Sequence, residues 1–157
     1  MGTVDIVTKE YMRENAIFAD AFNYLIYGGK KVIDPAGLTE IDTATSAVGK
    51  KDALQKYRDV LKAAVIKQDE KMSYVLLGIE NQTDVHYAMP VRNAIYDALQ
   101  YGRQVADIAA GHRRNKNDFS GKNNGEYLSG FLKEDHIRPV ITLVIHFGAE
   151  EWDGPLS

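Results

Sequence analysis

The chain has 157 residues, of which 45% are hydrophobic and 26% charged, and its formal net charge is −3. This length suits one domain, and the composition is that of a globular protein. The lack of cysteine excludes a disulfide scaffold, a zinc–thiolate site, an iron–sulfur cluster and cysteine nucleophilic catalysis. The longest apolar run, 140–147, is far shorter than the ~20 residues that span a bilayer. Because no signal-peptide pattern opens the chain, we expect a cytoplasmic protein that does not enter a membrane.

The net charge hides two basic stretches. Residues 50–71 contain seven basic and four acidic residues, and residues 103–122 contain five basic and two acidic ones. An acidic total weighs mildly against a nucleic-acid partner, but a phosphate backbone responds to local basic stretches more than to the total. Two solvated faces remain the simpler interpretation of these stretches.

The first third of the chain predicts a helix followed by short extended pieces. Residues 8–27 carry apolar side chains at helical spacing, with Thr8 as a possible cap and two glycines after the helix. Residues 31–34 and 38–43 read as short extended segments, and residues 44–55 as a loop. Few residues of the predicted sheet are therefore expected in this part of the chain.

The remainder predicts two long strands, a helix and a last strand. Residues 57–66 and 74–80 read as strands, with the charged cluster 67–71 as a turn between them, and the nearly all-apolar second strand is expected to be central. Residues 87–110 return to helical spacing, with Pro90 in the first turn. Residues 111–130 read as a loop and residues 139–147 as a strand. The order predicts an α/β fold in which helices pack on a small sheet.

Several common motifs are absent from the sequence. It has no G-x-G-x-x-G, no phosphate-binding loop and no G-x-S-x-G. Its four histidines show no H-x-x-x-H pairing, so a zinc hydrolase is not favoured. We interpret His146 as a partly buried structural histidine, and His86, His112 and His136 as surface residues.

The residues that carry chemistry are two acids on the predicted strands. Asp59 lies in the first of the two long strands, and Glu80 closes the second and is followed by Asn81 and Gln82. Because strand side chains alternate, Glu80 and Gln82 share a face. If the two strands pair, both carboxylates meet at neighbouring strand ends, where their repulsion favours a cation between them. Such oxygens suit Mg²⁺ or Mn²⁺, which can polarise a phosphate and activate water. An acid at a strand end is, however, more often a solvated boundary residue.

Four blocks of the sequence resemble the recombination-promoting nuclease (Rpn, YhgA-like) family. These are 57–62, 76–82, 87–101 and 138–148, and the run 17–26 is similar to the opening helix of that family. The family belongs to the PD-(D/E)XK nuclease superfamily, whose members have a restriction-endonuclease-like αβββαβ core. The resemblance covers nearly the whole chain except the loops. It implies a single nuclease-like domain over 1–157, cut short at its C-terminus.

The resemblance also implies roles for particular residues. Asp59 and Glu80 would be the two signature acids and would hold Mg²⁺, or Mn²⁺ in its place, with the Asn81 carbonyl. Gln82 would occupy the position of the signature lysine. An acid on the first helix, Asp20 or Glu14, would assist. The second long helix borders the site in this fold, so it would supply phosphate or substrate contacts: Arg92, Tyr96, Tyr101 and Gln104. Apart from the resemblance, a basic loop is expected to contact DNA phosphates if the domain binds DNA without cutting it: Arg113, Arg114, Lys116 and Lys122. For the tyrosines, core packing is the simpler interpretation.

The sequence departs from the family pattern at the lysine position. A glutamine carries no charge and accepts no proton at neutral pH, so water activation would depend mainly on the metal. Asp42 is a rival for the signature aspartate, and we prefer Asp59 because its strand is expected to pair with the strand of Glu80. These features leave two functions open.

The first function is a metal-dependent endodeoxyribonuclease, a hydrolase of phosphodiester bonds linked to recombination or to transposase-like mobile elements. The second is a catalytically decayed module of the same fold that binds DNA or a protein partner without cutting. In both cases DNA is the expected partner, and a homodimer is a further expectation. Hydrolysis of a glycoside by paired carboxylates is a weaker third possibility, because nothing in the sequence marks a sugar-binding cleft.

Overall fold

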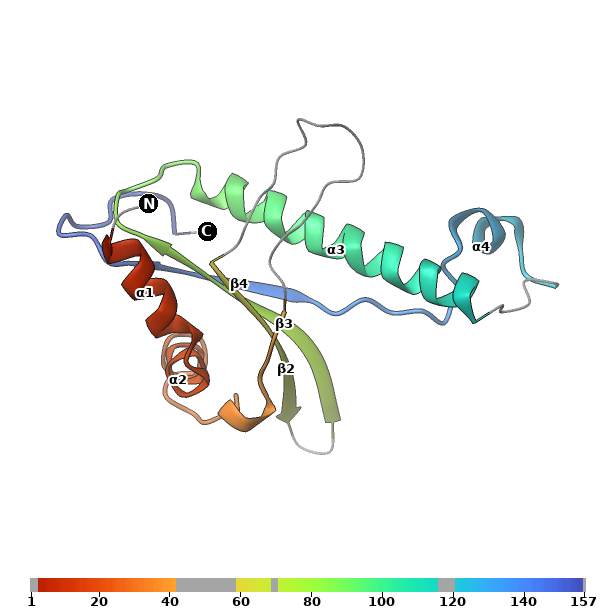
Figure 1. Cartoon of the computed structure of the whole chain (residues 1–157), viewed down its shortest axis with the longest axis horizontal. Coiled ribbons are helices and arrows are strands. Elements are labelled where there is room, and N and C mark those ends of the chain that lie inside the picture. The colour runs from red at the N-terminus through yellow and green to blue at the C-terminus, as the bar shows by residue number, and fades with distance from the viewer. Residues whose placement is uncertain (1–2, 42–58, 69–70, 116–120, 157) are drawn as a thin grey trace.

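A computed structural model describes residues 3–41, 59–68, 71–115 and 121–156 of the chain. The two helices α1 (Thr3–Arg13) and α2 (Asn15–Leu25) pack on one side of a sheet, and the long helix α3 (Met89–Arg114) runs along the other side (Figure 1). The short helix α4 (Asn124–Ser129) lies beyond the far end of α3 (Figure 1). The prediction of an α/β fold with a small sheet flanked by helices is confirmed.

The sheet has four strands in the order β1-β2-β3-β4. Strands β1 (Thr39–Glu40), β2 (Val60–Gln68) and β3 (Lys71–Gln82) are antiparallel, and β4 (Val140–His146) is parallel to β3. Strand β3 therefore lies in the middle, as its continuous apolar run predicts. The predicted antiparallel pairing of the two long strands is also confirmed, with Val60 opposite Ile79.

The hydrophobic core lies between the sheet and the first two helices. Phe18 and Phe22 of α2 are fully buried there, with ring centroids 5.1 Å apart, against Leu77 and Ile79 of β3. The neighbouring residues of β3, Leu76, Gly78 and Glu80, point to the opposite face because strand side chains alternate. That face is the one covered by α3.

The prediction of one helix over 8–27 is wrong, because the chain forms two helices that meet at Glu14. The side chain of Lys62 in β2 explains the break: it is buried and donates hydrogen bonds to the Arg13 carbonyl and to Oδ1 of Asn15. A lysine amine here satisfies groups that a helix end leaves without partners. Burial lowers the pKa of Lys62, against the opposing effect of nearby Glu40.

The short segment 31–34 is not a strand, although its sequence resembles one. Its backbone is bound by a side chain instead, because Oδ1 of the buried Asn23 accepts hydrogen bonds from the amides of Val32 and Ile33, at 2.9 and 2.8 Å. The predicted extended segment 38–43 contains the two-residue strand β1, and residues 42–43 lie outside the described ranges, as does the predicted loop 44–55. The two glycines after α2 have positive φ, 59° and 83°, as the prediction of a helix stop requires.

The predicted loop 111–130 is also wrong in part. Helix α3 continues to Arg114, and α4 begins within the segment. A capping box starts α4: Oδ1 of Asn123 accepts from the Glu126 amide, and Glu126 accepts from the Asn123 amide. Short polar residues that read as a loop signal thus act here as a helix cap. In the described part of the chain, no helix is both long and apolar enough to cross a bilayer.

Candidate functional site

The two acids that the sequence singles out lie on the face of the sheet beneath α3. Asp59 directly precedes β2, and continuing the pairing of Val60 with Ile79 by one position places Asp59 opposite Glu80. Directly opposite residues of antiparallel strands have Cβ atoms roughly 5 Å apart and point to the same face. Oδ2 of Asp59 accepts a hydrogen bond of 2.8 Å from the Asn81 amide, which fixes the side chain against the end of β3.

The Glu80 carboxylate is buried and faces the first turns of α3. Its side chain is only 1% exposed, and Oε2 lies 3.7 Å from Nη2 of Arg92. Arg92 in turn donates a hydrogen bond of 2.9 Å from Nε to the Tyr96 hydroxyl, and its guanidinium stacks over the Tyr96 ring. A buried carboxylate is costly without such compensation, so Arg92 compensates the charge of Glu80, and the divalent cation expected between the two acids stays a prediction.

The pKa of Arg92 responds to the charges of both acids. Burial by itself lowers the pKa of Arg92, but the hydrogen bond to Tyr96 and the negative charges of Glu80 and Asp59 outweigh burial and raise it. Arg92 therefore stays charged at every physiological pH. From the sequence, Arg92 is expected only as a phosphate or substrate contact, because its position near Glu80 depends on the packing of α3.

The donor set fits a hard divalent cation of the Mg²⁺ type. Asp59 and Glu80 offer carboxylate oxygens from neighbouring strand positions on one face. Within the described ranges, no group of three or more His, Cys, Asp or Glu side chains could hold a metal. Mg²⁺ is commonly held by one or two carboxylates and completes its shell with water and substrate phosphate. Two carboxylates therefore suffice, although a cation would compete with Arg92 for Glu80.

Gln82 lies two residues beyond Glu80 on the same face, as the sequence predicts, at the level of His146 in β4. Asn81 points to the other face, and its side-chain Oδ1 and Nδ2 are buried without hydrogen-bond partners in the described structure. The contact that the structure gives Asn81 is therefore through its main chain, to Asp59. A metal role for the Asn81 carbonyl stays a prediction.

The two helper acids expected on the first helix do not lie at this face. Asp20 belongs to α2, which packs on the opposite face of the sheet, and its side chain is exposed. Glu14 occupies the break between α1 and α2, where its charge acts on Lys62. Asp42, the rival signature aspartate, lies outside the described ranges.

The expected DNA contacts separate into two groups. Arg113 and Arg114 are exposed in the last turn of α3, at the opposite end of the helix from Arg92. Lys122 forms an ion pair of 3.1 Å with Glu134, and Lys116 lies outside the described ranges. These basic residues therefore do not form one patch with Arg92, and a role in DNA binding stays a prediction.

Tyr101 and Gln104 connect α3 to the start of β4. The Tyr101 hydroxyl accepts a hydrogen bond from the Val140 amide, at 3.1 Å. The Gln104 amide donates to the carbonyl of Arg138, at 3.1 Å, and accepts from its amide, at 2.7 Å. Tyr96 is buried, at 6% exposure. The simpler interpretation of the tyrosines as packing residues agrees with these contacts.

The prediction that His112 is a surface residue is wrong. Its side chain is 16% exposed and pairs through Nε2 with Asp135, at 2.8 Å from Oδ2. Burial works to raise the pKa of Asp135, but the hydrogen bonds from the Leu132 amide and from His112 lower it overall. His86 and His136 are exposed as predicted, and His146 is half-buried with Nε2 2.7 Å from the Glu150 carbonyl.

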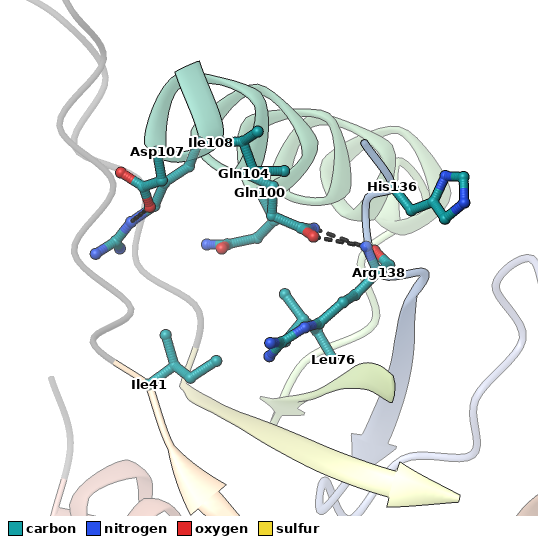
Figure 2. A pocket seen from close by; sticks show the side chains of 9 residues that line it. Ile41, Leu76, Gln100, Gln104, Asp107, Ile108, His136 and Arg138 are labelled. Carbon is teal, nitrogen blue, oxygen red and sulfur yellow. Dashed lines mark hydrogen bonds and ion pairs between the residues drawn. The ribbon is translucent and has the colours of Figure 1, made fainter. Parts of the chain in front are cut away.

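A second cluster under the same helix has no signal in the sequence. Gln100, Arg103 and Arg138 line a cavity of about 410 Å³ between α3 and the sheet. Figure 2 shows Gln100 on the helix and Arg138 on the strand side of this cavity. The two contributing segments are more than thirty residues apart in the sequence. No local pattern connects Gln100 with Arg138, so only their packing brings them together.

Comparison of the chain with protein-family models, with curated proteins and with solved structures finds no match to any of them.

Proposed function

We propose that this chain is a metal-dependent nuclease domain of the PD-(D/E)XK type that hydrolyses phosphodiester bonds in DNA. One observation carries the proposal: Asp59 directly precedes β2 and accepts a hydrogen bond from the Asn81 amide of β3, next to the buried Glu80 carboxylate and its ion pair with Arg92. The order of strands and helices is compatible with an αβββαβ core. The resemblance to the Rpn family supports the same function, including its link to recombination and transposase-like elements.

Each residue of the cluster has a role in this proposal. Asp59 and Glu80 would hold Mg²⁺, which when bound supplies charge stabilisation at the phosphate and a more acidic water. Arg92 would bind a phosphate oxygen, because its guanidinium has donors left after its contact with Tyr96. Gln82 would orient water through its amide, which can donate and accept hydrogen bonds but takes up no proton.

The Arg92–Glu80 contact favours a second candidate function. A cation already neutralises Glu80, and the lysine position holds Gln82. Such a site could bind DNA, or a protein partner, without cutting it. In that case the acids serve the fold, and the domain needs no metal.

A plasmid-nicking assay distinguishes the two functions. The nuclease proposal expects cutting with Mg²⁺ or Mn²⁺ that stops on addition of a chelator. Asp59→Ala and Glu80→Ala should each lose activity by about a hundredfold or more, because removal of one electrostatic contact at a reacting centre has effects of this size. Glu151→Gln, which removes an exposed acid of the C-terminal segment, serves as the matched control and should cut normally.

The binding alternative predicts a different result in the same samples. A folded protein that does not cut with either metal and shows no calorimetric Mn²⁺ binding, yet binds DNA with strong salt dependence, would establish it. If Asp59→Ala and Glu80→Ala cut as well as the unmodified protein, the proposed site is wrong.

A further inference from the structure

The cavity under the second half of α3 is lined by a polar side chain of that helix. Gln100 is 5% exposed, and its amide group points into the cavity beneath α3 (Figure 2). A side-chain amide can both donate and accept hydrogen bonds. The Gln100 amide therefore suits a ligand that can do the same.

Two guanidinium groups line the same cavity. Arg138 enters from the segment just before β4, and its guanidinium lies over the Tyr74 ring, 5.4 Å from the centroid. Arg103 comes from α3 and contacts Asp107 at 3.8 Å, so one acid offsets part of the positive charge. Two guanidinium groups that approach one cavity are well suited to a phosphate group, which accepts bidentate hydrogen bonds.

The rest of the cavity is apolar. Ile41, Leu76 and Ile108 line it beside the polar groups. The volume of about 410 Å³ falls within the range of roughly 300–1,000 Å³ in which small organic molecules bind. An apolar surface, one amide and two guanidinium groups together match a planar heterocycle that carries a phosphate, and a nucleotide has this composition.

The cavity and the carboxylate site share one face of the sheet and one helix. Leu76 lies four residues before Glu80 on β3, which corresponds to a distance of ~13 Å along the strand. A nucleic-acid strand that passes between α3 and the sheet would reach both sites. A base that is paired in a duplex cannot enter a cavity between a helix and a sheet, so the nucleotide held there would be unpaired.

We infer that this cavity binds a nucleoside phosphate, as one unpaired unit of the strand on which the carboxylate site acts. The inference rests on the proposed function and names its substrate as single-stranded or locally unpaired DNA. The Gln100 amide forms hydrogen bonds with the edge of the base, and Arg103 and Arg138 form ion pairs with the phosphate. The same chemistry would accept a free nucleoside monophosphate.

The test measures binding without metal, so that it does not depend on cutting. A short fluorescein-labelled single-stranded oligonucleotide is titrated with the full chain in the presence of a chelator. Gln100→Glu, which places a negative charge in the cavity, and Arg138→Met are each expected to weaken binding by about tenfold or more, equivalent to ~1.4 kcal/mol. Lys30→Met removes an exposed charge from the turn after α2 and should change binding less than about twofold. The inference would be overturned if the unmodified protein and the three variants bound the oligonucleotide equally well.

The NMR signals of the Gln100 side-chain amide separate the two sources of the ligand. They should shift when the single-stranded oligonucleotide is added, and a matching duplex should shift them less. A shift with deoxyadenosine monophosphate alone would overturn the assignment to a strand and leave a site for free nucleotides. If neither the single-stranded oligonucleotide nor deoxyadenosine monophosphate shifts these signals, the cavity binds no nucleotide and the inference is overturned.

The nuclease proposal and this inference can fail separately. If the plasmid is never cut but oligonucleotide binding depends on Gln100 and Arg138, the nuclease proposal alone is wrong. If Asp59→Ala abolishes cutting while Gln100→Glu cuts and binds as the unmodified protein does, the cavity inference alone is wrong. Gln100→Leu provides a check on the fold, because it removes the buried amide without adding charge.

Discussion

Arg92→Met tests whether the cation above Glu80 compensates a buried charge. At 3.7 Å between Oε2 and Nη2, two unit charges attract by about 4–5 kcal/mol at an effective dielectric constant of about 20. The Arg92 side chain is 33% exposed, so solvent screening and the entropy of holding it in place reduce the net value. We therefore expect the variant to lose about 1–3 kcal/mol of unfolding free energy at neutral pH.

Thermal and urea unfolding measure this loss. For a chain of this size, 1 kcal/mol corresponds to roughly 2–4 °C in Tm. Arg114→Met provides the matched control, because it removes an exposed arginine from the other end of α3, and it should cost only a few tenths of a kcal/mol. Adding Glu80→Gln to Arg92→Met should restore part of the stability, because the buried charge disappears.

The same variant tests the metal site. Without Arg92, a divalent cation no longer competes with a guanidinium for Glu80, so Mn²⁺ should raise the Tm of Arg92→Met more than that of the unmodified protein. The reasoning would be refuted if Arg92→Met were as stable as Arg114→Met and gained nothing from Glu80→Gln. If Mn²⁺ raised the Tm of Arg92→Met and of the unmodified protein equally, Arg92 would not compete with a divalent cation for Glu80.

Two further changes follow from single contacts. Asp135, whose pKa is lowered in the folded state, stabilises the protein at pH values above its unfolded pKa of about 3.9, and this contribution disappears as the pH falls through the lower folded value. Asp135→Asn should therefore flatten the acid limb of the pH–stability profile and loosen the pairing with His112, as hydrogen exchange can show. Asn23→Ala should cost about 2–4 kcal/mol, because it leaves the buried amide and carbonyl of Ile33 without their side-chain partner, and a loss below 1 kcal/mol in urea unfolding would show that water replaces the side chain.

The local part of the candidate site could be predicted from the sequence. The apolar run 74–80 identifies a buried central strand, and the alternation of strand side chains puts Glu80 and Gln82 on one face. The charged cluster 67–71 predicts the antiparallel hairpin that brings Asp59 to the level of Glu80. These inferences succeed because strand periodicity and turns depend on neighbouring residues.

The sequence by itself therefore determined the class of fold, the central strand and the pairing of the strands that carry the two acids. Only the tertiary structure decided that Arg92 lies above Glu80, that Lys62 fills the break between α1 and α2, and that Gln100 meets Arg138 across a cavity. The physical reason is that each of these contacts joins side chains from separate elements. Their positions follow from how a helix packs on a sheet face, and residue spacing along the chain contains no information about that packing.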